Sequence, residues 1–504
     1  MARFMKQGDV IEMAVSYLPS HLRSRAEARL MGSWMNGKQY EHSDPDGPDG
    51  IEDDDRGYGR AFSPNKRIIE TEYENLRGLS PNAFAGLITR SYSQLAHLEG
   101  ISRPGVTGTL PIWDTFRRNR WLSRSTAVHE GALGQAVAYG VVMPGEDPLT
   151  GSKMSKMIGK SAERMSAYYD AEDDEWPTIA VEAVERFEAE EGEILMGANG
   201  RAGWYVFIYD AYVVHRLICK GDGLTAEDWT YLDHVEHGMP VPPVARCANR
   251  LDLDGKATGV IEPVLPLLRR IDQDTFDRLI NQRFGAWQVR YIAGMAKPDS
   301  KTEAAAQRMR LSVEDLLMST NKDTKFGTLP AGPLEPQIAA MDADLRLLSA
   351  ITQMPPHHLL GLSSNLQAEA LAAATEGMHR QAFEFRTNAS EFHEQMARLV
   401  AMAEGDFVLA AAWDLRVRWR DEQSGSLNQA AQALGQLATT LKVPVGMLWE
   451  KIPGWTDDDV QRATEMAEDG TLEQILAELA KVTDPAEEKP EEGSEEKPAD
   501  GATD

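Results

Sequence analysis

The sequence predicts a mainly helical α+β fold made of several substructures. Segments rich in β-branched and aromatic residues lie between residues 138 and 218, and the chain beyond residue 259 has the apolar spacing of long helices. The chain has 504 residues, more than one compact core ordinarily supports. We therefore expect a small α+β module that is followed by an extended helical region.

The module is expected to begin with helices and to continue into a sheet. One helix is expected to follow Leu18-Pro19-Ser20 and to run to about Trp34, and a second to run from Ser80 to Leu95. A third helix, beginning near residue 121, is expected to pass into a strand. The strands are expected at residues 138–143, 178–184, 204–208 and 212–218.

Two amphipathic helices follow the module. The first has an apolar face formed by Leu267, Leu268, Ile271, Leu279, Ile280 and Phe284, with Arg269, Asp272, Asp277 and Arg283 elsewhere on the helix. In the second, Ile338, Met341, Leu345 and Leu348 recur three and four residues apart. Pro355 and Pro356 are expected to end the second helix, because proline has no backbone donor and restricts the residue before it.

A basic segment separates the two helices, and further helices follow them. The basic residues of the segment are Lys297, Lys301, Arg308, Arg310, Lys322 and Lys325. From Gln367 to about Ala403 the sequence predicts one helix, whose roughly 37 residues would span about 55 Å. A helix of that length usually braces an extended structure. Residues 427–481 are expected to form three or four short helices, two of them with capping signals at Thr456 and Thr471.

The composition is that of a globular, acidic chain. Acidic residues number 79 and basic residues 52, which gives a net charge of −27 and argues against DNA binding over the general surface. The surplus is concentrated at residues 44–55 and in the tail 481–504, both of which are expected to be solvated, disordered chain. No stretch reaches the roughly 18 apolar residues of a membrane helix, and the N-terminus is not a signal peptide.

Two motifs resemble catalytic sites but lack the residues that such sites need. Met157-Ile158-Gly159-Lys160-Ser161 ends like a phosphate-binding loop, yet Met154 stands where the first glycine is required. Glu376 and His379 form a Glu-x-x-His pair, but a dinuclear metal bundle needs a second such pair. We therefore expect neither a nucleotide site nor a metal centre, and no cofactor.

The remaining reactive side chains have simpler interpretations. His357 and His358 follow two prolines in an expected turn and have no further ligand at metal-binding spacing. Cys219 and Cys247 are interpreted as small core residues, and two cysteines do not make a disulfide framework. They fit synthesis in a reducing cytoplasm. The sequence therefore predicts a protein that is not an enzyme.

The order of these features resembles the portal proteins of tailed bacteriophages, particularly those of actinobacterial phages. Three stretches resemble the family in their residues as well as in their order along the chain. They are residues 237–250, which include His237-Gly238-Met239-Pro240; residues 354–371, which include Met354-Pro355-Pro356-His357-His358; and Ile452-Pro453-Gly454-Trp455. The resemblance extends from about residue 15 to residue 470. It implies a portal fold with wing, stem, clip and crown regions, assembled as a ring.

The resemblance also implies a division of the chain into regions. These are a wing at 1–257, stem helices at 258–290 and 334–353, a clip at 291–333, a tunnel loop at 354–367, a long wing helix with its return at 368–420, a crown at 421–480 and the acidic tail at 481–504. Ile271, Leu279, Leu345 and Leu348 would pack the stem, and the basic residues of the segment 291–333 would make the clip contacts. Leu362, Ser363, Ser364, Asn365 and Gln367 would form the tunnel loop.

The implied function is that of a dodecameric ring at one capsid vertex, part of a virion assembled from protein made in the host cytoplasm. Double-stranded DNA would pass through the ring without sequence-specific contacts during packaging and ejection. Terminase, head-completion proteins and the major capsid protein would be partners, and no membrane is implied. Twelve chains of −27 would carry about −324, and such a wall repels phosphate. The alternatives are a nucleotide-driven motor, which needs a working phosphate loop, and another virion protein such as a minor capsid or head-completion protein.

Overall fold

The computed structural model forms two compact units. It describes residues 5–40, 69–106, 110–147, 149–171, 174–185, 204–220, 223–286, 290–293, 325–328, 332–360, 368–420 and 427–449, with parts of 451–470. The first unit comprises Met1–Gly105 and Leu110–Arg420, and the second comprises Val106–Thr109 and Asp421–Asp504. The acidic segment 44–55, the tail 481–504 and the two capping signals at Thr456 and Thr471 lie outside the described residues.

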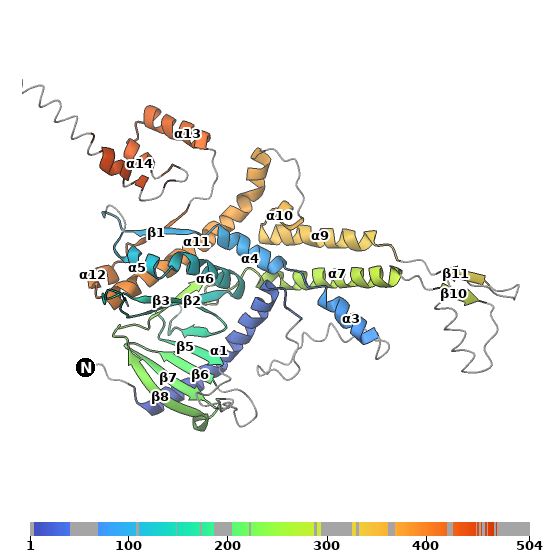
Figure 1. Cartoon of the computed structure of the whole chain (residues 1–504), viewed down its shortest axis with the longest axis horizontal. Helices are drawn as coiled ribbons and strands as arrows, with labels where there is room; N and C mark the ends of the chain where they lie inside the picture. Colours follow the sequence, from blue (N-terminus) through green and yellow to red (C-terminus); the bar gives the residue numbers. More distant parts are fainter. Residues whose placement is uncertain are drawn as a thin grey trace, which may run out of the picture. The chain divides into compact units, whose positions relative to one another are not determined.

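A five-stranded antiparallel sheet forms one layer of the first unit (Figure 1). Its strands are, in spatial order, β4 (Met165–Tyr168), β5 (Ile179–Glu185), β6 (Trp204–Tyr209), β7 (Val213–Cys219) and β8 (Trp229–Glu236). The predicted strands at 178–184, 204–208 and 212–218 are confirmed as β5, β6 and β7. The strands β4 and β8 were not predicted, and β8 is exposed along most of its length, so its sequence lacks an apolar pattern.

Helix α1 (Gln7–Met35) packs on this sheet and begins earlier than the sequence predicts. Val10, Ala14 and Leu18 lie four residues apart on α1 and are buried in one cluster with sheet residues such as Val206. This burial stabilises a helix that continues through Pro19, although proline removes one backbone hydrogen bond. The prediction of a helix beginning only after Pro19 was therefore wrong.

A three-stranded sheet forms the next layer, with β2 (Val137–Met143) between β3 (Lys156–Ser161) and β9 (Val244–Ala248). Gly140 of β2 and Gly159 of β3 are paired across the sheet, so they point to the same face. A Cβ at Gly140 would lie 2.9 Å from Phe392 of α11 (Ala368–Glu404), and one at Gly159 would lie 2.7 Å from Val128 of α6 (Trp121–Gln135). The two glycines therefore allow both helices to pack closely on this face.

The remaining elements of the first unit complete the core around these layers. They are α3 (Ile69–Gly78), α4 (Phe84–Gln94), β1 (Leu98–Ser102), α5 (Ile112–Arg118), the short 3-10 helices η2 (Ala226–Asp228) and η3 (Glu262–Val264), α12 (Phe407–Ala410) and β12 (Arg416–Trp419), which pairs with β1. Trp121, Phe116, Phe385 and Phe392 are among the largest fully buried side chains. The predicted helices near 80–95 and 121 and the long helix at 367–403 are confirmed as α4, α6 and α11.

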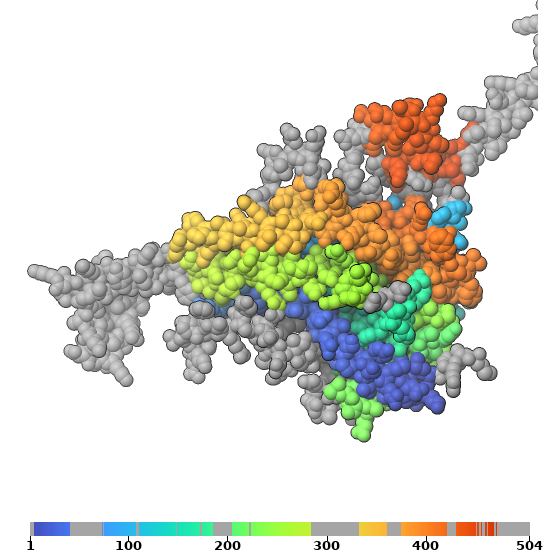
Figure 2. Space-filling model, turned by 180° about the vertical axis from the view of Figure 1, so that it is seen from behind, coloured from blue at the N-terminus to red at the C-terminus, as the bar shows by residue number. Residues whose placement is uncertain are grey.

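An extended helical hairpin follows the sheets. It consists of α7 (Leu265–Ala286), β10 (Arg290–Ala293), β11 (Lys325–Thr328), α9 (Glu335–Thr352) and the short α10 (Pro356–Leu360). Helices α7 and α9 lie side by side in both views (Figures 1 and 2), and β10 and β11 form an antiparallel ribbon beyond them. The predicted pair of amphipathic helices is thus confirmed.

The second unit contains α13 (Leu427–Thr440) and α14 (Val445–Trp449). Most of their residues are exposed, and Leu448 is the one buried large apolar residue among those described in α13 and α14. Within the described part of the whole chain, no helix is both long and apolar enough to cross a membrane.

Candidate functional site

The candidate functional site is the helix pair α7 and α9, together with the turn that follows α9. Polar contacts fix the two helices in an antiparallel register. Arg270 Nε and Nη2 donate to the two carboxylate oxygens of Asp344 at 2.5 and 2.6 Å, and Asn281 Nδ2 donates to Gln337 Oε1 at 3.3 Å. The contact nearer the start of α7 thus reaches the later part of α9, as an antiparallel hairpin requires.

The inner faces of the pair contain the residues that the sequence singles out for stem packing. Ile271, Leu345 and Leu348 are 0%, 5% and 0% exposed and belong to one buried cluster. Leu279 lies further along α7 and is half-buried. The structure therefore brings three of the four residues into the main core and leaves the fourth outside that cluster.

Asp272 anchors the pair to the N-terminal segment, and sequence reasoning missed it. It is 1% exposed, and its carboxylate accepts hydrogen bonds from Gln39 Nε2 at 2.8 Å, Tyr40 Oη at 3.1 Å and the backbone and side chain of Asn82, the backbone contact being 2.8 Å. Burial raises the pKa of Asp272, and the hydrogen bonds oppose that shift.

The expectation that Asp272 lies off the apolar face of its helix was wrong. The available signal was its spacing, because Asp272 follows Leu268 by four residues and therefore lies on the same face. The hydrogen-bond donors that offset the cost of burying the Asp272 carboxylate are distant in sequence. The composition of the helix alone could not reveal them.

The outer face of α9 is apolar and exposed. Its members recur at helical spacing on the side away from Leu345 and Leu348. They are Ala339, Ala340, Ala343, Leu347, Ala350 and Ile351, all exposed, with Leu347 and Ile351 at 45% and 49%. We call these six residues the outer face of α9. Within the described part of the chain, the inner face of α9 is buried and this outer face remains exposed, although both are apolar.

The turn after α9 is held against two other helices. Gln353 ends α9 in the left-handed conformation, with φ at 55°, and Tyr92 of α4 donates a hydrogen bond to the carbonyl of Thr352. A Cβ at Gly377 of α11 would lie 3.2 Å from Cβ of Gln353, so glycine permits this close approach. The turn therefore has a fixed position relative to α4 and α11.

His357 and His358 lie in a helix rather than in the expected turn. Pro356 is the first residue of α10, a position that suits proline because its missing donor would have no partner there. The prolines thus end α9, as expected, but they begin a short helix instead of a continuous loop. The tunnel-loop residues Leu362, Ser363, Ser364, Asn365 and Gln367 lie outside the described residues, between α10 and α11.

The basic segment between the two helices is described only at its base. The ribbon pairs Arg290 with Thr328 and Ala293 with Lys325. Of the residues expected to make clip contacts, Lys325 begins β11. The others, Lys297, Lys301, Arg308, Arg310 and Lys322, lie outside the described residues.

The phosphate-loop-like motif is a strand. Met157–Ser161 belongs to β3, which pairs with β2 and leads into β4 rather than into a helix. Lys160 forms an ion pair with Glu182, whose other carboxylate oxygen accepts a hydrogen bond from Tyr209 Oη at 2.6 Å. The lysine that would hold a phosphate therefore serves as the partner of a buried carboxylate.

The other chemical candidates have structural roles. Glu376 accepts from Arg380 Nε at 3.1 Å, an ion pair one helical turn away, instead of pairing with His379. Both cysteines are completely buried, as expected for core residues. Among the described residues, no group of three or more His, Cys, Asp or Glu side chains could hold a metal ion.

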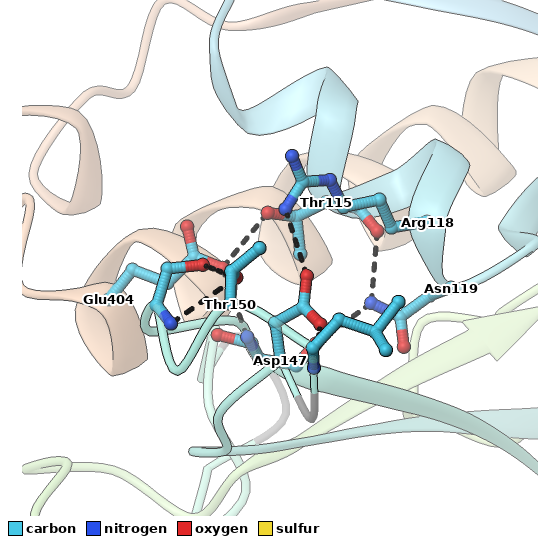
Figure 3. A network of polar contacts seen from close by, with 9 residues as sticks. Thr115, Arg118, Asn119, Asp147, Thr150 and Glu404 are labelled. Carbon is cyan, nitrogen blue, oxygen red and sulfur yellow. Dashed lines mark hydrogen bonds and ion pairs between the residues drawn. The ribbon is translucent and has the colours of Figure 1, made fainter.

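A polar network that sequence reasoning also missed fixes the C-terminal end of α11 (Figure 3). Glu404 Oε1 accepts hydrogen bonds from Thr115 Oγ1 at 2.9 Å and from the backbone of Ser155 at 3.1 Å. Asn119 Nδ2 also donates to the carbonyls of Thr115 and Ser155, at 2.9 and 2.8 Å. The network joins α11 to α5 and to the segment before β3. The long helix is therefore held near both of its ends.

Comparison with known proteins identifies the kind of molecule that this fold represents. The family model described as "Phage portal protein, SPP1 Gp6-like" matches residues 18–482. The chain therefore belongs to this family of phage portal proteins, which are structural components of the virion.

Two further comparisons accompany the family match. The chain is similar to a solved structure described as "Neck of native GTA particle computed with C12 symmetry", with 11% sequence identity and a TM-score of 0.42. The similarity covers 78% of this chain and 94% of that one. No curated protein matches the sequence.

Proposed function

We propose that the chain assembles into a dodecameric ring at one capsid vertex, through which double-stranded DNA passes during packaging and ejection. In this proposal α7 and α9 are the stem, residues 291–333 are the clip, and the segment that begins after α10 is the tunnel loop. Terminase, head-completion proteins and the major capsid protein dock on the ring. DNA passes without sequence-specific contacts. Membership of the portal family supports this role.

The exposed apolar face of α9 is the main structural observation in support of the proposed ring. Copies in a closed ring contact one another through two different surfaces, so each chain must offer a complementary pair. Helices α9 and α3 lie on opposite sides of α7 (Figure 1), and Tyr73 of α3 packs on Phe276 of α7 with ring centroids 5.8 Å apart. We propose that the outer face of α9 packs against the α3 side of the neighbouring copy.

The charge of the chain suits a conduit for DNA. Binding to phosphate is driven by lysine and arginine, and here acidic residues exceed basic ones by 27. A wall of this kind repels the backbone of passing DNA and leaves few contacts that would slow it. The tunnel loop fits the same requirement, because Ser363, Ser364 and Asn365 are short, polar and uncharged.

Substitution of Leu347 by aspartate tests the ring interface. Leu347 is 45% exposed in the single chain, so Leu347→Asp leaves the chain folded but places a charge in the proposed contact. We expect the mass of the purified particle to fall from about 670 kDa, twelve chains of 55.8 kDa, to that of the single chain.

The control for this test is Gln282→Asp, which adds the same charge at an exposed polar position of α7. This variant is expected to retain the full mass. Rings of normal mass from Leu347→Asp would show that the outer face of α9 is not an interface.

Labelling of the tunnel loop tests the channel. Ser364→Cys introduces a thiol into a chain whose two native cysteines are buried, so a bulky maleimide label should react there alone. We expect labelled rings of normal mass to package DNA far more slowly than unlabelled rings of the same variant. If complete labelling leaves the packaging rate unchanged, residues 362–367 do not line the channel.

A further inference from the structure

A line of buried side chains joins α6 to the C-terminal half of α11. His129 on α6 and His393 on α11 are both 0% exposed, and their Nε2 atoms lie 3.0 Å apart. The indole Nε1 of Trp121, the first residue of α6, lies 3.4 Å from Nδ1 of His393. Phe385 and Trp419 pack on the ring of His129 at centroid distances of 5.5 and 5.6 Å. The result is a polar line inside an apolar core.

The indole fixes the direction of donation along this line. Trp121 Nε1 carries a proton and cannot accept, so Nδ1 of His393 must be the acceptor. A neutral His393 then carries its proton on Nε2 and donates it to His129. Nε2 of His129 must therefore be unprotonated. Each hydrogen bond runs one way, from Trp121 to His393 and from His393 to His129, and both imidazoles are neutral.

We propose that this line is an acid-sensitive lock that holds α11 on α6. An added proton on His393 would occupy Nδ1 and face the N–H of Trp121. An added proton on His129 would occupy Nε2 and face the N–H of His393. In either case two donors oppose each other in a fully buried site, so the hydrogen bond is lost and a charge is left unpaired.

The surroundings of the pair favour its neutral form. Burial lowers the pKa of His129 to about 3; the nearby backbone of Ala96 opposes this shift, and His97 adds to it. Burial, followed by the proximity of His129, holds the pKa of His393 well below its ordinary value. The rings that face the pair from α11 and β12, those of Phe385, Phe392 and Trp419, carry no charge.

The lock is therefore closed at neutral pH and weakens in acid. In the unfolded chain both histidines titrate near pH 6.5. Because their folded-state pKa values are lower, their contribution to stability is complete above pH 6.5 and is lost as the pH falls below it. Each histidine lowers the folding equilibrium constant about tenfold per pH unit in that window. Acid thus weakens the contact between α11 and α6.

Urea unfolding of the full chain at several pH values between about 7.5 and 5 tests the lock. The double variant His129→Gln, His393→Gln keeps neutral hydrogen-bonding groups but cannot titrate. His379→Gln, on α11 outside the line, is the matched control. Near pH 5 we expect the slope of the logarithm of the folding constant against pH to be about two units smaller in the double variant than in the wild type and the control, whereas above pH 7 the slopes should agree.

Three buried histidines of the described residues lie outside the line and remain in all three proteins: His21, His215 and His237. Burial lowers the pKa of each, that of His21 to about 4, so they contribute the same slope to every protein and cancel in the comparison. If the double variant and the wild type lose stability at the same rate with falling pH, the two histidines do not form the lock.

The unaltered protein gives an independent readout if the double variant does not fold. Exchange of the imidazole C2 hydrogen, measured by mass spectrometry, follows the titration of each histidine separately. His129 and His393 are expected to show slow exchange and no midpoint near pH 6.5. A midpoint near 6.5 at either residue would overturn the proposal.

Discussion

Asp272 joins the helix pair to the N-terminal segment through one carboxylate. Its two oxygens accept hydrogen bonds from residues 39, 40 and 82, which belong to two separate stretches of chain. A buried carboxylate stabilises the contact between two segments only while each donor around it has an acceptor oxygen. The geometry of the joint therefore depends on the chemical identity of this single side chain.

Replacing Asp272 by asparagine should weaken the joint. The amide of Asp272→Asn would direct N–H groups at one set of donors, which costs about 1–3 kcal/mol for the buried groups left without acceptors. The measurement is the urea midpoint of unfolding at neutral pH. Asp277→Asn is the matched control, because Asp277 is exposed on the same helix. Equal midpoints for the two variants would contradict the anchoring role.

At the residue scale, the sequence predicts packing better than it predicts polar partners. Ile271, Leu345 and Leu348 could be identified as buried because helical spacing alone reports the inward face. The burial of Asp272 and of the pair His129 and His393 could not be predicted in this way, because their hydrogen-bond partners are more than forty residues away in the chain. Spacing carries no information about contacts of that range.

Helix α9 has a different environment on each of its two apolar faces. Leu348 lies on the inner face and is fully buried, whereas its neighbour Leu347 lies on the outer face and is half exposed. The inner face holds the chain together, and the outer face is available to another copy. In the proposed ring, the buried residue Leu348 would therefore serve folding and its neighbour Leu347 would serve assembly.

Substitution of Leu348 by aspartate should destabilise the single chain itself. Leu348→Asp buries an unpaired carboxylate, at a cost of about 3–5 kcal/mol. Thermal unfolding should therefore begin at a clearly lower temperature than in the wild type, while Leu347→Asp should unfold like a wild-type chain that is not assembled. Normal thermal stability and normal rings from Leu348→Asp would refute the packing of α9 on α7.

At the element scale, long and regular segments are predicted well and short or exposed ones poorly. The extent of α11 agrees with its prediction to within one residue at each end, because thirty-seven residues of continuous helical pattern leave little ambiguity. The first half of α1 was missed because Pro19 suggested a boundary. Strand β3 was missed because its sequence resembles a phosphate loop.

The whole molecule combines a packed first unit with long acidic segments that add little apolar surface. The tail 481–504 holds nine acidic residues and three lysines. A composition of this kind offers little apolar surface for burial. We therefore expect the ring to depend on residues 1–480.

Removal of residues 481–504 should leave assembly intact. The truncated chain is expected to form particles whose mass falls only by the mass of the deleted residues, because the tail contributes almost nothing to burial. Light scattering coupled to gel filtration gives that mass directly. Particles of single-chain mass would mean that the tail takes part in the interface.

The central claim is that this phage portal protein forms a closed ring in which α9 faces a neighbouring copy. Electron cryomicroscopy of the purified particle, reconstructed without imposed symmetry, tests it most directly. The account predicts a ring of about twelve copies around an open channel, with Leu347 and Ile351 of each chain buried against the next. A particle without a central channel, or a ring in which the outer face of α9 points into solvent, would contradict it.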